Sequence, residues 1–469
     1  NLITINKKVI LIRVSNISKH IEYACKAFFK DLPKNIIAVT GTNGKTSVAD
    51  FFRQIFLINK TQVASIGTLG IKKNSRTKSS TLTSPDIISL YKELSIMKKN
   101  KINNVIIEAS SHGLHQGRLN GLNIKCGIFT NFSQDHLDYH KSMKRYYEAK
   151  TILFNKLLKR KSTVITSSDF VKLKSLKKIC KAKNLKMITE KKLKLDLSAF
   201  PKKIVGTFQK KNFAHAALAA SLCGIKNNFL QKALKKIKHV NGRLQLVKVF
   251  PNKCKVFVDY AHTPDALKKT LETLSLYNKN LTVVFGCGGD RDVSKRSKMA
   301  LIAKKFCKKI YVTDDNPRYE NPKIIRRQIT SKLFGAWFKN IGNRRKAINL
   351  AVKNSEPNEV ILIAGKGHEN FQYFKNKSVI FNDADVVKKI NFKRKKAKNY
   401  PKIFNLNLLK KLKIKAKKGF LGVSINSKKI SKENLFIGIK GKNKDGNLFT
   451  NQALKKGASF CVVNRYINK

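Results

Sequence analysis

A glycine-rich turn near the start of the chain has the residue types that bind phosphate. The sequence GTNGKT at residues 41–46 follows a short apolar run and precedes a stretch with the apolar spacing of a helix. Backbone N–H groups of such a turn, with the positive end of the following helix, hold phosphate oxygens, while Lys45 reaches the outer phosphates and Thr46 can ligate Mg²⁺. The usual phosphate-loop pattern has a glycine five positions before Gly44, where Val39 stands. The turn predicts nucleotide binding, with an ordinary glycine turn as the alternative.

Further polar and glycine-bearing turns follow other expected strands. Short runs rich in Ile and Val alternate with amphipathic stretches, a pattern typical of parallel sheets built from strand–helix–strand units. Because ligands of such sheets bind outside the carboxyl ends of the strands, we expect the chemistry in these turns. The expected strands are residues 36–39, 104–107, 127–130, 255–258, 281–285, 309–312 and 359–363. The turns that follow them read TGTNGKT, EASSHG, NFSQDH, DYAHTPD, GCGGDRD, TDDNPR and AGKGHE.

The turns form two sets, which predicts an α/β protein with two α/β domains. The first three turns precede NGRL at residues 241–244 and the last four follow it. We predict a parallel-sheet P-loop domain that binds ATP at residues 35–243 and a Rossmann-like domain at residues 244–392. A lysine-rich segment follows at residues 393–418. We interpret it as a basic linker, with a nucleic-acid-binding patch as the alternative.

Composition restricts the partners of the chain. Its 469 residues are 42% hydrophobic, and no apolar run approaches the ~20 residues of a bilayer-spanning helix, so we expect a cytoplasmic protein without a membrane span. The formal charge of +72 suggests nucleic acid at first. The lysines are spread over nearly every segment, however, and no recognisable nucleic-acid module accompanies them, so we expect no specific nucleic-acid partner. A basic nucleic-acid-binding P-loop protein stays the alternative. The eight cysteines lack metal-binding spacing and are expected to be buried apolar residues.

The turns and their flanking residues resemble one known family. TGTNGKT is similar to the shortened phosphate loop of the Mur ligase family and of the related folylpolyglutamate synthetases. The other segments occur in the order and approximate spacing of the diaminopimelate-adding (MurE-type) branch of the Mur ligases. Folylpolyglutamate synthesis, a second alternative, gives no reason for DDNPR. The matching segments are IIEASSHGLHQGRL at 106–119, FTNFSQDHLDYH at 129–140, EAK at 148–150, GTFQKKN at 206–212, NGRL at 241–244, DYAHTPDAL at 259–267, FGCGGDRDVSKR at 285–296, DDNPR at 314–318 and AGKGHE at 364–369.

The resemblance implies an ATP-dependent carbon–nitrogen ligase of peptidoglycan precursor synthesis. Members of this branch join meso-2,6-diaminopimelate to UDP-N-acetylmuramoyl-L-alanyl-D-glutamate. A carboxylate must be activated before an amine can displace its oxygen, and transfer of the γ-phosphoryl group of ATP gives an acyl phosphate. Both steps develop negative charge, so preplaced cations, Mg²⁺ among them, should dominate catalysis.

The same resemblance assigns catalytic roles to Lys45, Glu108, His136 and Lys150. Thr46 and Glu108 would ligate one Mg²⁺, and His136 and Lys150 would serve a second. Lys150 would carry a carbamate derived from CO₂, which turns an ammonium into an oxygen donor. The alternatives are an ordinary surface pair for Glu108 and Lys150 and a hydrogen-bonded structural role for His136. The implied ATP-binding positions are Gly41, Thr42, Asn43, Gly44, Lys45, Thr46, Asn212, Arg243 and Asp259.

Two substrate sites are implied as well. Arg318, at the end of DDNPR, would pair with the distal carboxylate of diaminopimelate, because a planar guanidinium matches a carboxylate bidentately. A surface arginine after a proline turn is the alternative. The Ser and Thr residues of the dipeptide site could instead cap helices. For the ATP-binding positions Asn212, Arg243 and Asp259, the alternatives are an ordinary helix Asn, a linker Arg and a cap at a strand end. The positions for the UDP-muramoyl dipeptide are Thr83, Ser84, Ser110, Gln116 and Arg118. Those for diaminopimelate are Arg291, Asp315, Asn316, Arg318, Gly365 and Glu369.

The two ends of the chain depart from the family pattern. Residues 1–34 are expected to be a remnant of a uridine-binding domain, and Asn at position 1 suggests an N-terminal truncation. Residues 419–469 resemble the start of another uridine-binding domain, with NSK and DGN where DSR and DGH are usual. We therefore predict a fusion, in which a second Mur ligase of the MurF type begins here. Circular rearrangement of one enzyme is the alternative.

Overall fold

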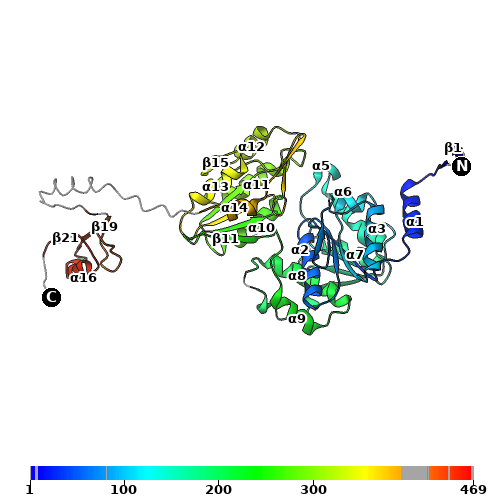
Figure 1. Cartoon of the computed structure of the whole chain (residues 1–469), viewed down its shortest axis with the longest axis horizontal. Helices are drawn as coiled ribbons and strands as arrows, with labels where there is room; N and C mark the ends of the chain where they lie inside the picture. The colour runs from blue at the N-terminus through cyan, green and yellow to red at the C-terminus, as the bar shows by residue number, and fades with distance from the viewer. Residues whose placement is uncertain are drawn as a thin grey trace. The chain divides into compact units, whose positions relative to one another are not determined.

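The structure, a computed structural model, describes residues 2–5, 9–80, 82–201, 203–391, 420, 422–441 and 444–465. It divides into two units, Asn1–Ile390 and Asn391–Lys469 (Figure 1). The basic linker predicted at residues 393–418 lies outside the described residues.

The larger sheet of the first unit carries the phosphate-binding turn at its centre. Its strands are β3 (Asn35–Thr40), β4 (Ala64–Gly67), β5 (Gly70–Lys73), β6 (Arg76–Lys78), β7 (Asn104–Glu108), β8 (Ile124–Phe129), β9 (Thr163–Thr166) and β10 (Lys186–Thr189). They lie in the order β10-β9-β8-β3-β7-β4-β5-β6. Neighbours from β10 to β4 are parallel, whereas β5 and β6 are antiparallel. The turns after β3, β7 and β8 therefore lie side by side at one edge.

Helices cover both faces of this sheet. Every side chain of β3 is buried, and strand alternation sends Ile36 and Ala38 into one core and Ile37 and Val39 into the other. Such continuous apolar strands are typical of a parallel sheet buried on both faces. The helices are α2 (Lys45–Ile58), α3 (Ile87–Lys99), α4 (Ser111–His115), α5 (Leu137–His140), α6 (Met143–Ile152), α7 (Leu173–Ala182), α8 (Thr207–Leu222) and α9 (Asn227–Lys236). Side chains of α3, α6 and α7 enter the first core, and those of α2, α8 and α9 enter the second (Figure 1).

A second sheet brings four more of the turns together. It contains β11 (Gln245–Val249), β12 (Lys255–Asp259), β13 (Leu281–Phe285), β14 (Lys309–Val312), β15 (Phe338–Asn340) and β16 (Val360–Ala364). They lie in the order β11-β12-β16-β13-β14-β15, and all neighbours except β11 and β12 are parallel. Asp259 pairs with Ala364 at the ends of β12 and β16, so DYAHTPD and AGKGHE emerge at the same level.

The turn after β12 also begins a helix. Thr263 accepts a hydrogen bond from the backbone N–H of Ala266 at 3.2 Å, and Pro264 occupies the first helical position, where its fixed φ favours a helix start. The helices of this part are α10 (Pro264–Ser275), α11 (Ser294–Phe306), α12 (Pro322–Thr330), α13 (Arg344–Lys353) and α14 (Asp383–Lys389). A hairpin of β17 (Phe371–Phe374) and β18 (Lys377–Ile380) precedes α14.

The remaining elements flank these sheets in the sequence. Strands β1 (Leu2–Ile5) and β2 (Val9–Ile12) pair antiparallel, and α1 (Ile17–Phe28) places Cys25 in the same core as Tyr91. The second unit contains the parallel strands β19 (Gly422–Ser424), β20 (Asn434–Ile437) and β21 (Phe460–Val462), with α16 (Thr450–Lys455). Over the described part of the chain, no helix combines the length and apolar character that a bilayer crossing needs.

The predicted α/β fold class is confirmed, and a strand is present at each of the expected positions. The largest difference concerns β8, which begins at Ile124 rather than at residue 127. The exposed Lys125 interrupts the run of apolar residues in this strand, so the apolar pattern indicates the strand only from residue 127 onward. The domain boundaries at 1–34, 35–243, 244–392 and 419–469 stay predictions.

Candidate active site

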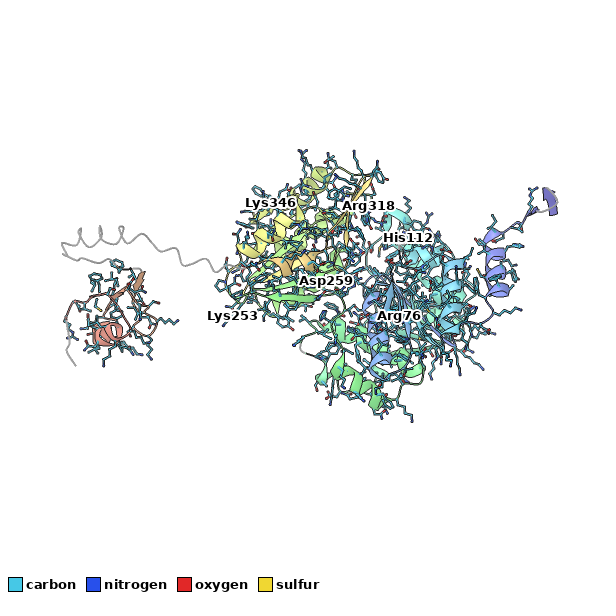
Figure 2. All side chains as sticks on the ribbon, in the orientation of Figure 1. Arg76, His112, Lys253, Asp259, Arg318 and Lys346 are labelled. Atoms are coloured by element: carbon cyan, nitrogen blue, oxygen red, sulfur yellow. The ribbon has the colours of Figure 1, made fainter. Side chains whose placement is uncertain are left out.

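The turns at the strand ends surround one large cleft. Its volume is about 1130 Å³, and a cavity of about 100 Å³ shares several lining residues with it, among them His136, Arg318 and Glu369. Figure 2 labels His112, Asp259 and Arg318, all of which line the large cleft. The predicted site residues that line this cleft are Thr42, Asn43, Gly44, Lys45, Thr46, Thr83, Ser84, Ser110, Gln116, Arg118, His136, Lys150, Asn212, Arg243, Asp259, Arg291, Arg318 and Glu369.

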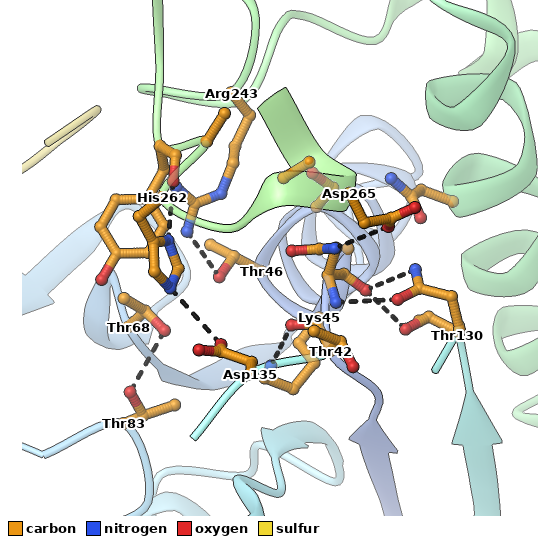
Figure 3. Close-up of a pocket in the computed structure, with 18 of the residues that line it drawn as sticks. Thr42, Lys45, Thr46, Thr68, Thr83, Thr130, Asp135, Arg243, His262 and Asp265 are labelled. Carbon is orange, nitrogen blue, oxygen red and sulfur yellow. Dashed lines mark hydrogen bonds and ion pairs between the residues drawn. The ribbon is translucent and has the colours of Figure 1, made fainter. Parts of the chain in front are cut away.

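The phosphate-binding turn is closed around its own lysine. Gly44 has a φ of 87°, the left-handed conformation that favours glycine, and a Cβ there would lie 2.6 Å from Oδ1 of Asn212 on α8. The Nζ of Lys45 donates to the carbonyl oxygens of Gly41 at 2.8 Å and Thr42 at 3.0 Å. Burial lowers the pKa of Lys45, and nearby carboxylates oppose this shift. Figure 3 shows the lysine inside this turn. The turn thus holds a cation where phosphates would bind.

Glu108, the last residue of β7, lies against the start of α2 and is 1% exposed. Its Oε2 accepts hydrogen bonds from the hydroxyls of Thr46 at 2.9 Å and Thr68 at 3.0 Å, and its Oε1 accepts one from the Thr68 N–H at 2.9 Å. Gly67 leaves the space for this carboxylate, because a Cβ there would overlap with it. Clustered carboxylate and hydroxyl oxygens are the ligand type that Mg²⁺ prefers. Glu108 is buried, so the alternative that places it in an ordinary surface pair with Lys150 is wrong for this residue.

His136 and the preceding Asp135 form the next part of the wall. His136 has a φ of 53°, and its Nε2 lies 3.3 Å from Oδ2 of Asp135. Burial lowers the pKa of His136 to about 2, so its ring is neutral and able to ligate a metal. The Nε2 of His262, in the turn after β12, lies 3.6 Å from the same Asp135 oxygen (Figure 3). Sequence reasoning missed Asp135, although it stands beside His136 in NFSQDH.

Lys150 is buried next to the phosphate-binding turn. It is 1% exposed, its Nζ donates to the carbonyl of Gly41 at 2.9 Å, and it lies 4.4 Å from the centre of the Tyr146 ring. Burial, followed by the charge of Lys45, lowers the pKa of Lys150 well below its usual range. Burial therefore favours the uncharged, nucleophilic form of the amine. The surface alternative is wrong for this residue too.

Residues after the first sheet reach back to the phosphate-binding turn. A terminal nitrogen of Arg243 donates to the Thr46 hydroxyl at 3.0 Å, and the guanidinium lies 4.3 Å from the centre of the Tyr260 ring (Figure 3). Asp259 accepts a hydrogen bond from the Leu244 N–H, which matches the strand-end cap that was its alternative. Burial raises the pKa of Asp259.

The positions predicted for the muramoyl dipeptide are connected to Glu108. The Ser84 hydroxyl donates to the Glu108 carbonyl at 2.7 Å and lies 3.0 Å from the Ser110 hydroxyl. Arg118 donates to the Ser84 carbonyl at 2.6 Å and to Oε1 of Gln116 at 2.5 Å. Ser110 also caps α4, so the capping alternative applies to it. Thr83 lies within 3.3 Å of Thr68, between their hydroxyl oxygens.

All six positions predicted for diaminopimelate line the smaller cavity. Arg318 has a φ of 53° and donates to the Gly289 carbonyl at 2.7 Å. Arg291 lies 3.5 Å from Oδ2 of Asp138. The side-chain amide of Asn316 donates to Oε2 of Glu369 at 2.9 Å. The cavity therefore combines two guanidinium groups with carboxylates, which suits a ligand that carries both carboxylates and ammonium groups. The predicted positions that line it are Arg291, Asp315, Asn316, Arg318, Gly365 and Glu369.

Another stretch of the large cleft was not predicted. It is lined by side chains from the turn after β9, from α8 and from α10, and the buried His215 of α8 accepts or donates a hydrogen bond with Ser167 at 3.2 Å. No short motif marks this part, because its residues come from three separate segments. They include Ser167, Asp169, Phe170, Val171, Phe208, Lys211, His215, Lys269, Glu272 and Leu276.

Comparison with known proteins gives the family. Residues 39–228 match the Mur ligase middle domain and residues 242–367 match the Mur ligase glutamate ligase domain. A ligase from Rickettsia montanensis, UDP-N-acetylmuramoyl-L-alanyl-D-glutamate--2,6-diaminopimelate ligase, is 38% identical over 420 residues, which cover 83% of this chain and 87% of the relative. The chain belongs to the Mur ligase family. Residues 420–468 also match the family's catalytic domain.

Solved structures agree with this membership of the Mur ligase family. A structure of UDP-N-acetylmuramoyl-L-alanyl-D-glutamate--2,6-diaminopimelate ligase aligns with a TM-score of 0.53 at 30% identity, covering 79% of this chain and 81% of that one. The Mycobacterium tuberculosis folylpolyglutamate synthase complexed with ADP and AMPPCP aligns with a TM-score of 0.59 at 16% identity, covering 73% of this chain and 91% of that one. The second likeness shows a shared fold alone.

Proposed function

We propose that the protein is an ATP-dependent ligase that joins meso-2,6-diaminopimelate to UDP-N-acetylmuramoyl-L-alanyl-D-glutamate, a cytoplasmic step of peptidoglycan precursor synthesis. The observation that carries the proposal is that Lys45, Thr46 and Arg318 line one cleft, with Glu108 hydrogen-bonded to Thr46, so that a nucleotide, an acceptor carboxylate and an amino acid can meet there. The names of the relatives from Rickettsia montanensis and Rhizobium meliloti, the latter 36% identical over 403 residues, support the choice of substrates.

In the first step, the γ-phosphoryl group of ATP is transferred to the acceptor carboxylate. The bond from the γ-phosphorus to the bridging oxygen breaks, ADP leaves, and a carboxylate oxygen forms the new bond that makes an acyl phosphate. Lys45 would exchange its loop carbonyl partners for phosphate oxygens and stabilise the charge that moves between them. Arg243 and Asn212, which also line the cleft, would hold the nucleotide.

The residues of this site fit magnesium ions. Glu108 with Thr46 supplies a buried carboxylate and a hydroxyl, and the neutral His136 supplies a nitrogen on the facing turn. Mg²⁺ bound by these residues would offset the negative charge of the triphosphate and of the acceptor carboxylate. Two ions, one near Thr46 and Glu108 and one near His136 and Lys150, fit the predicted assignment.

Lys150 is suited to carry a carbamate. Its neutral amine can attack CO₂, so that an N–C bond forms and the proton of the amine is released to water. The product is an anion next to Lys45, whose ammonium attracts it. A carbamate oxygen is also a better donor for a hard cation than an amine.

In the second step, the amine of diaminopimelate attacks the acyl carbon. Phosphate leaves with the bonding electrons, the nitrogen loses a proton, and the amide remains. Arg318 would bind the distal carboxylate, with Arg291 and Asn316 assisting at the same end. Gly365 and Glu369 would hold the amino and carboxylate groups of the distal centre. Contacts between the two sheets' turns, such as Asp135 with His262, would exclude water that could hydrolyse the acyl phosphate.

The direct test measures release of ADP and phosphate by the purified chain. Release should require ATP, Mg²⁺, the UDP-muramoyl dipeptide and diaminopimelate together, and mass spectrometry should identify the tripeptide product. Turnover that is unaffected when either substrate is omitted would overturn the proposal. Turnover with a folate in place of the dipeptide would favour folylpolyglutamate synthesis. Salt-dependent binding of RNA with sequence preference would favour a nucleic-acid-binding protein.

The fusion with a second ligase also stays a proposal. Residues 420–468 match the family's catalytic domain, after the matches to the middle and glutamate ligase domains, and β19, β20 and β21 form a separate parallel sheet. The MurF-type identity and the N-terminal truncation rest on the sequence alone. Sequencing the full gene and its transcript decides whether a second ligase follows.

A further inference from the structure

A buried lysine lies beneath the cavity that would receive the amino acid. Lys366 stands in AGKGHE directly after β16, and none of its surface is exposed to solvent. Its ammonium donates to Oδ1 of Asn316 at 2.9 Å, to Oε2 of Glu369 at 2.8 Å and to the carbonyl of Phe371 at 2.7 Å. A lysine has three N–H donors, so all of them are used by these contacts.

These bonds connect two turns that are distant in the sequence. Asn316 belongs to the turn after β14, whereas Glu369 and Phe371 follow β16. Asn316 completes a closed triangle, because its side-chain N–H donates to Oε2 of Glu369 at 2.9 Å. The two side chains that accept from the lysine, Asn316 and Glu369, line the small cavity, whereas Lys366 itself does not.

The lysine determines which way the Asn316 amide is turned. Oδ1 of Asn316 accepts from Lys366 and, at 3.2 Å, from the Tyr373 N–H, so the amide nitrogen must face Glu369. With the amide reversed, its N–H groups would face two donors and the amide oxygen would face a carboxylate. A reversed amide would therefore lose its hydrogen bonds and meet like charge.

The lysine also orients Glu369. Glu369 accepts hydrogen bonds from Lys366 and from Asn316, and both of them end on its Oε2. The side chain of Glu369 is 27% exposed and lines both the large cleft and the small cavity, so Oε1 stays available to a ligand. A carboxylate that is held by one oxygen offers the other in a fixed direction, which suits the ammonium group of an amino acid.

We propose that Lys366 is the positioning residue of the amino-acid site, acting through Asn316 and Glu369 to set the direction of its donor and acceptor groups. This role rests on the proposed ligase function. In this role Lys366 does not contact the substrate, and it takes no part in binding ATP or the acceptor carboxylate. Replacement of Lys366 should therefore weaken the binding of diaminopimelate and leave the binding of ATP and the dipeptide unchanged.

The test compares Lys366→Met with Lys377→Met in the full chain, by steady-state release of ADP. Lys377 lies exposed in β18 and serves as the matched control. For Lys366→Met, the KM for diaminopimelate should rise about 10- to 100-fold, the size expected for lost hydrogen bonds to a charged group. The KM values for ATP and the dipeptide should stay within about twofold of wild type, as should all values for Lys377→Met. Equal changes in all three KM values, or no change, overturn the role.

A double-mutant cycle with Glu369→Gln separates positioning from general destabilisation. If Lys366 acts through Glu369, the double variant should raise the KM for diaminopimelate by less than the product of the two single effects. A multiplicative result contradicts the proposal. Lys366→Gln, which keeps two N–H donors without the charge, is measured in the same way and decides the outcome if Lys366→Met does not fold. Wild-type turnover without diaminopimelate would overturn the ligase function, whereas diaminopimelate-dependent turnover with an unshifted KM in the Lys366 variants overturns the positioning role alone.

Discussion

Asp135 and His262 connect the turns of the two sheets within the active-site cleft. They are 127 positions apart in the sequence, yet Nε2 of His262 lies 3.6 Å from Oδ2 of Asp135. Burial alone would raise the pKa of Asp135, but the hydrogen bond from His262 and nearby positive charge, including that of Lys295, hold it well below its usual range. The carboxylate therefore stays ionised and keeps both rings in place.

Replacement of Asp135 by Asn should impair turnover without unfolding the chain. The amide keeps the size of the side chain but loses the charge, so the contact between the two turns weakens and His136 is oriented less firmly. We expect kcat/KM to fall about 10- to 100-fold. Asp385→Asn, at an exposed position on α14, should behave as wild type in the same assay of ADP release. Equal activity of both variants would show that the contact has no role in turnover.

Gly67→Ala should displace the Glu108 carboxylate. A Cβ at this position would overlap with the carboxylate, whereas a Cβ at Gly441 would meet its nearest neighbour at an ordinary 3.5 Å. We expect Gly67→Ala to need a higher Mg²⁺ concentration for half-maximal activity, by about tenfold or more. Gly441→Ala should leave that concentration unchanged. A normal Mg²⁺ requirement in Gly67→Ala would remove Glu108 from the metal site.

Protonation of His215 should weaken the fold in mild acid. Burial lowers its pKa to about 4, against about 6.5 in an unfolded chain. Because the unfolded chain then binds the proton first, the contribution of His215 to stability is complete above about pH 6.5 and is lost as the pH falls towards 4. Between pH 7 and pH 5 the loss is about 2 kcal/mol. Urea unfolding at both pH values should show a smaller difference for His215→Leu than for wild type, and an unchanged difference for the exposed His20→Leu. An equal difference in all three proteins would contradict the prediction.

The central strands could be predicted because they are short apolar runs that end at polar turns. Edge strands gave no such signal, since β6 is the exposed tripeptide Arg76–Lys78 and β10 begins with the exposed Lys186. The polar residues of the turns were predicted for the same reason, as they follow the apolar runs directly. Their side-by-side arrangement follows from the parallel order of β8, β3 and β7.

What could not be predicted depends on contacts between distant segments. Lys366 lies within a recognised motif, but only the packing of the turn after β16 against that after β14 shows that it binds Asn316. The contact of Asp135 with His262 has the same origin. Burial of Glu108 and Lys150 was equally invisible in the sequence, because charged residues are usually exposed.

Lys150 should carry a carbamate that can be observed directly. With ¹³C-labelled bicarbonate, NMR of the wild-type chain should show a carbamate carbonyl signal that Lys150→Gln lacks. Burial favours the unprotonated amine, and only an unprotonated nitrogen attacks CO₂. Lys156→Gln, at an exposed position six residues later, should retain the signal. Removal of dissolved CO₂ should lower activity, and added bicarbonate should restore it. A signal that persists in Lys150→Gln would place the carbamate elsewhere.

Arg318→Ala should remove the preference for diaminopimelate over lysine. The two amino acids differ by the distal carboxylate, and the Arg318 guanidinium lines the cavity in which that group would bind. Loss of a hydrogen-bonded charge pair should raise the KM for diaminopimelate about 10- to 100-fold, while the KM for lysine, which lacks the carboxylate, should change little. Arg327→Ala, exposed on α12, should keep the wild-type preference. The ratio of kcat/KM for the two amino acids decides the matter, because a change in folding or in ATP binding would lower both values equally. If the ratio in Arg318→Ala equals that of wild type, another residue, with Arg291 the first to examine, recognises the carboxylate.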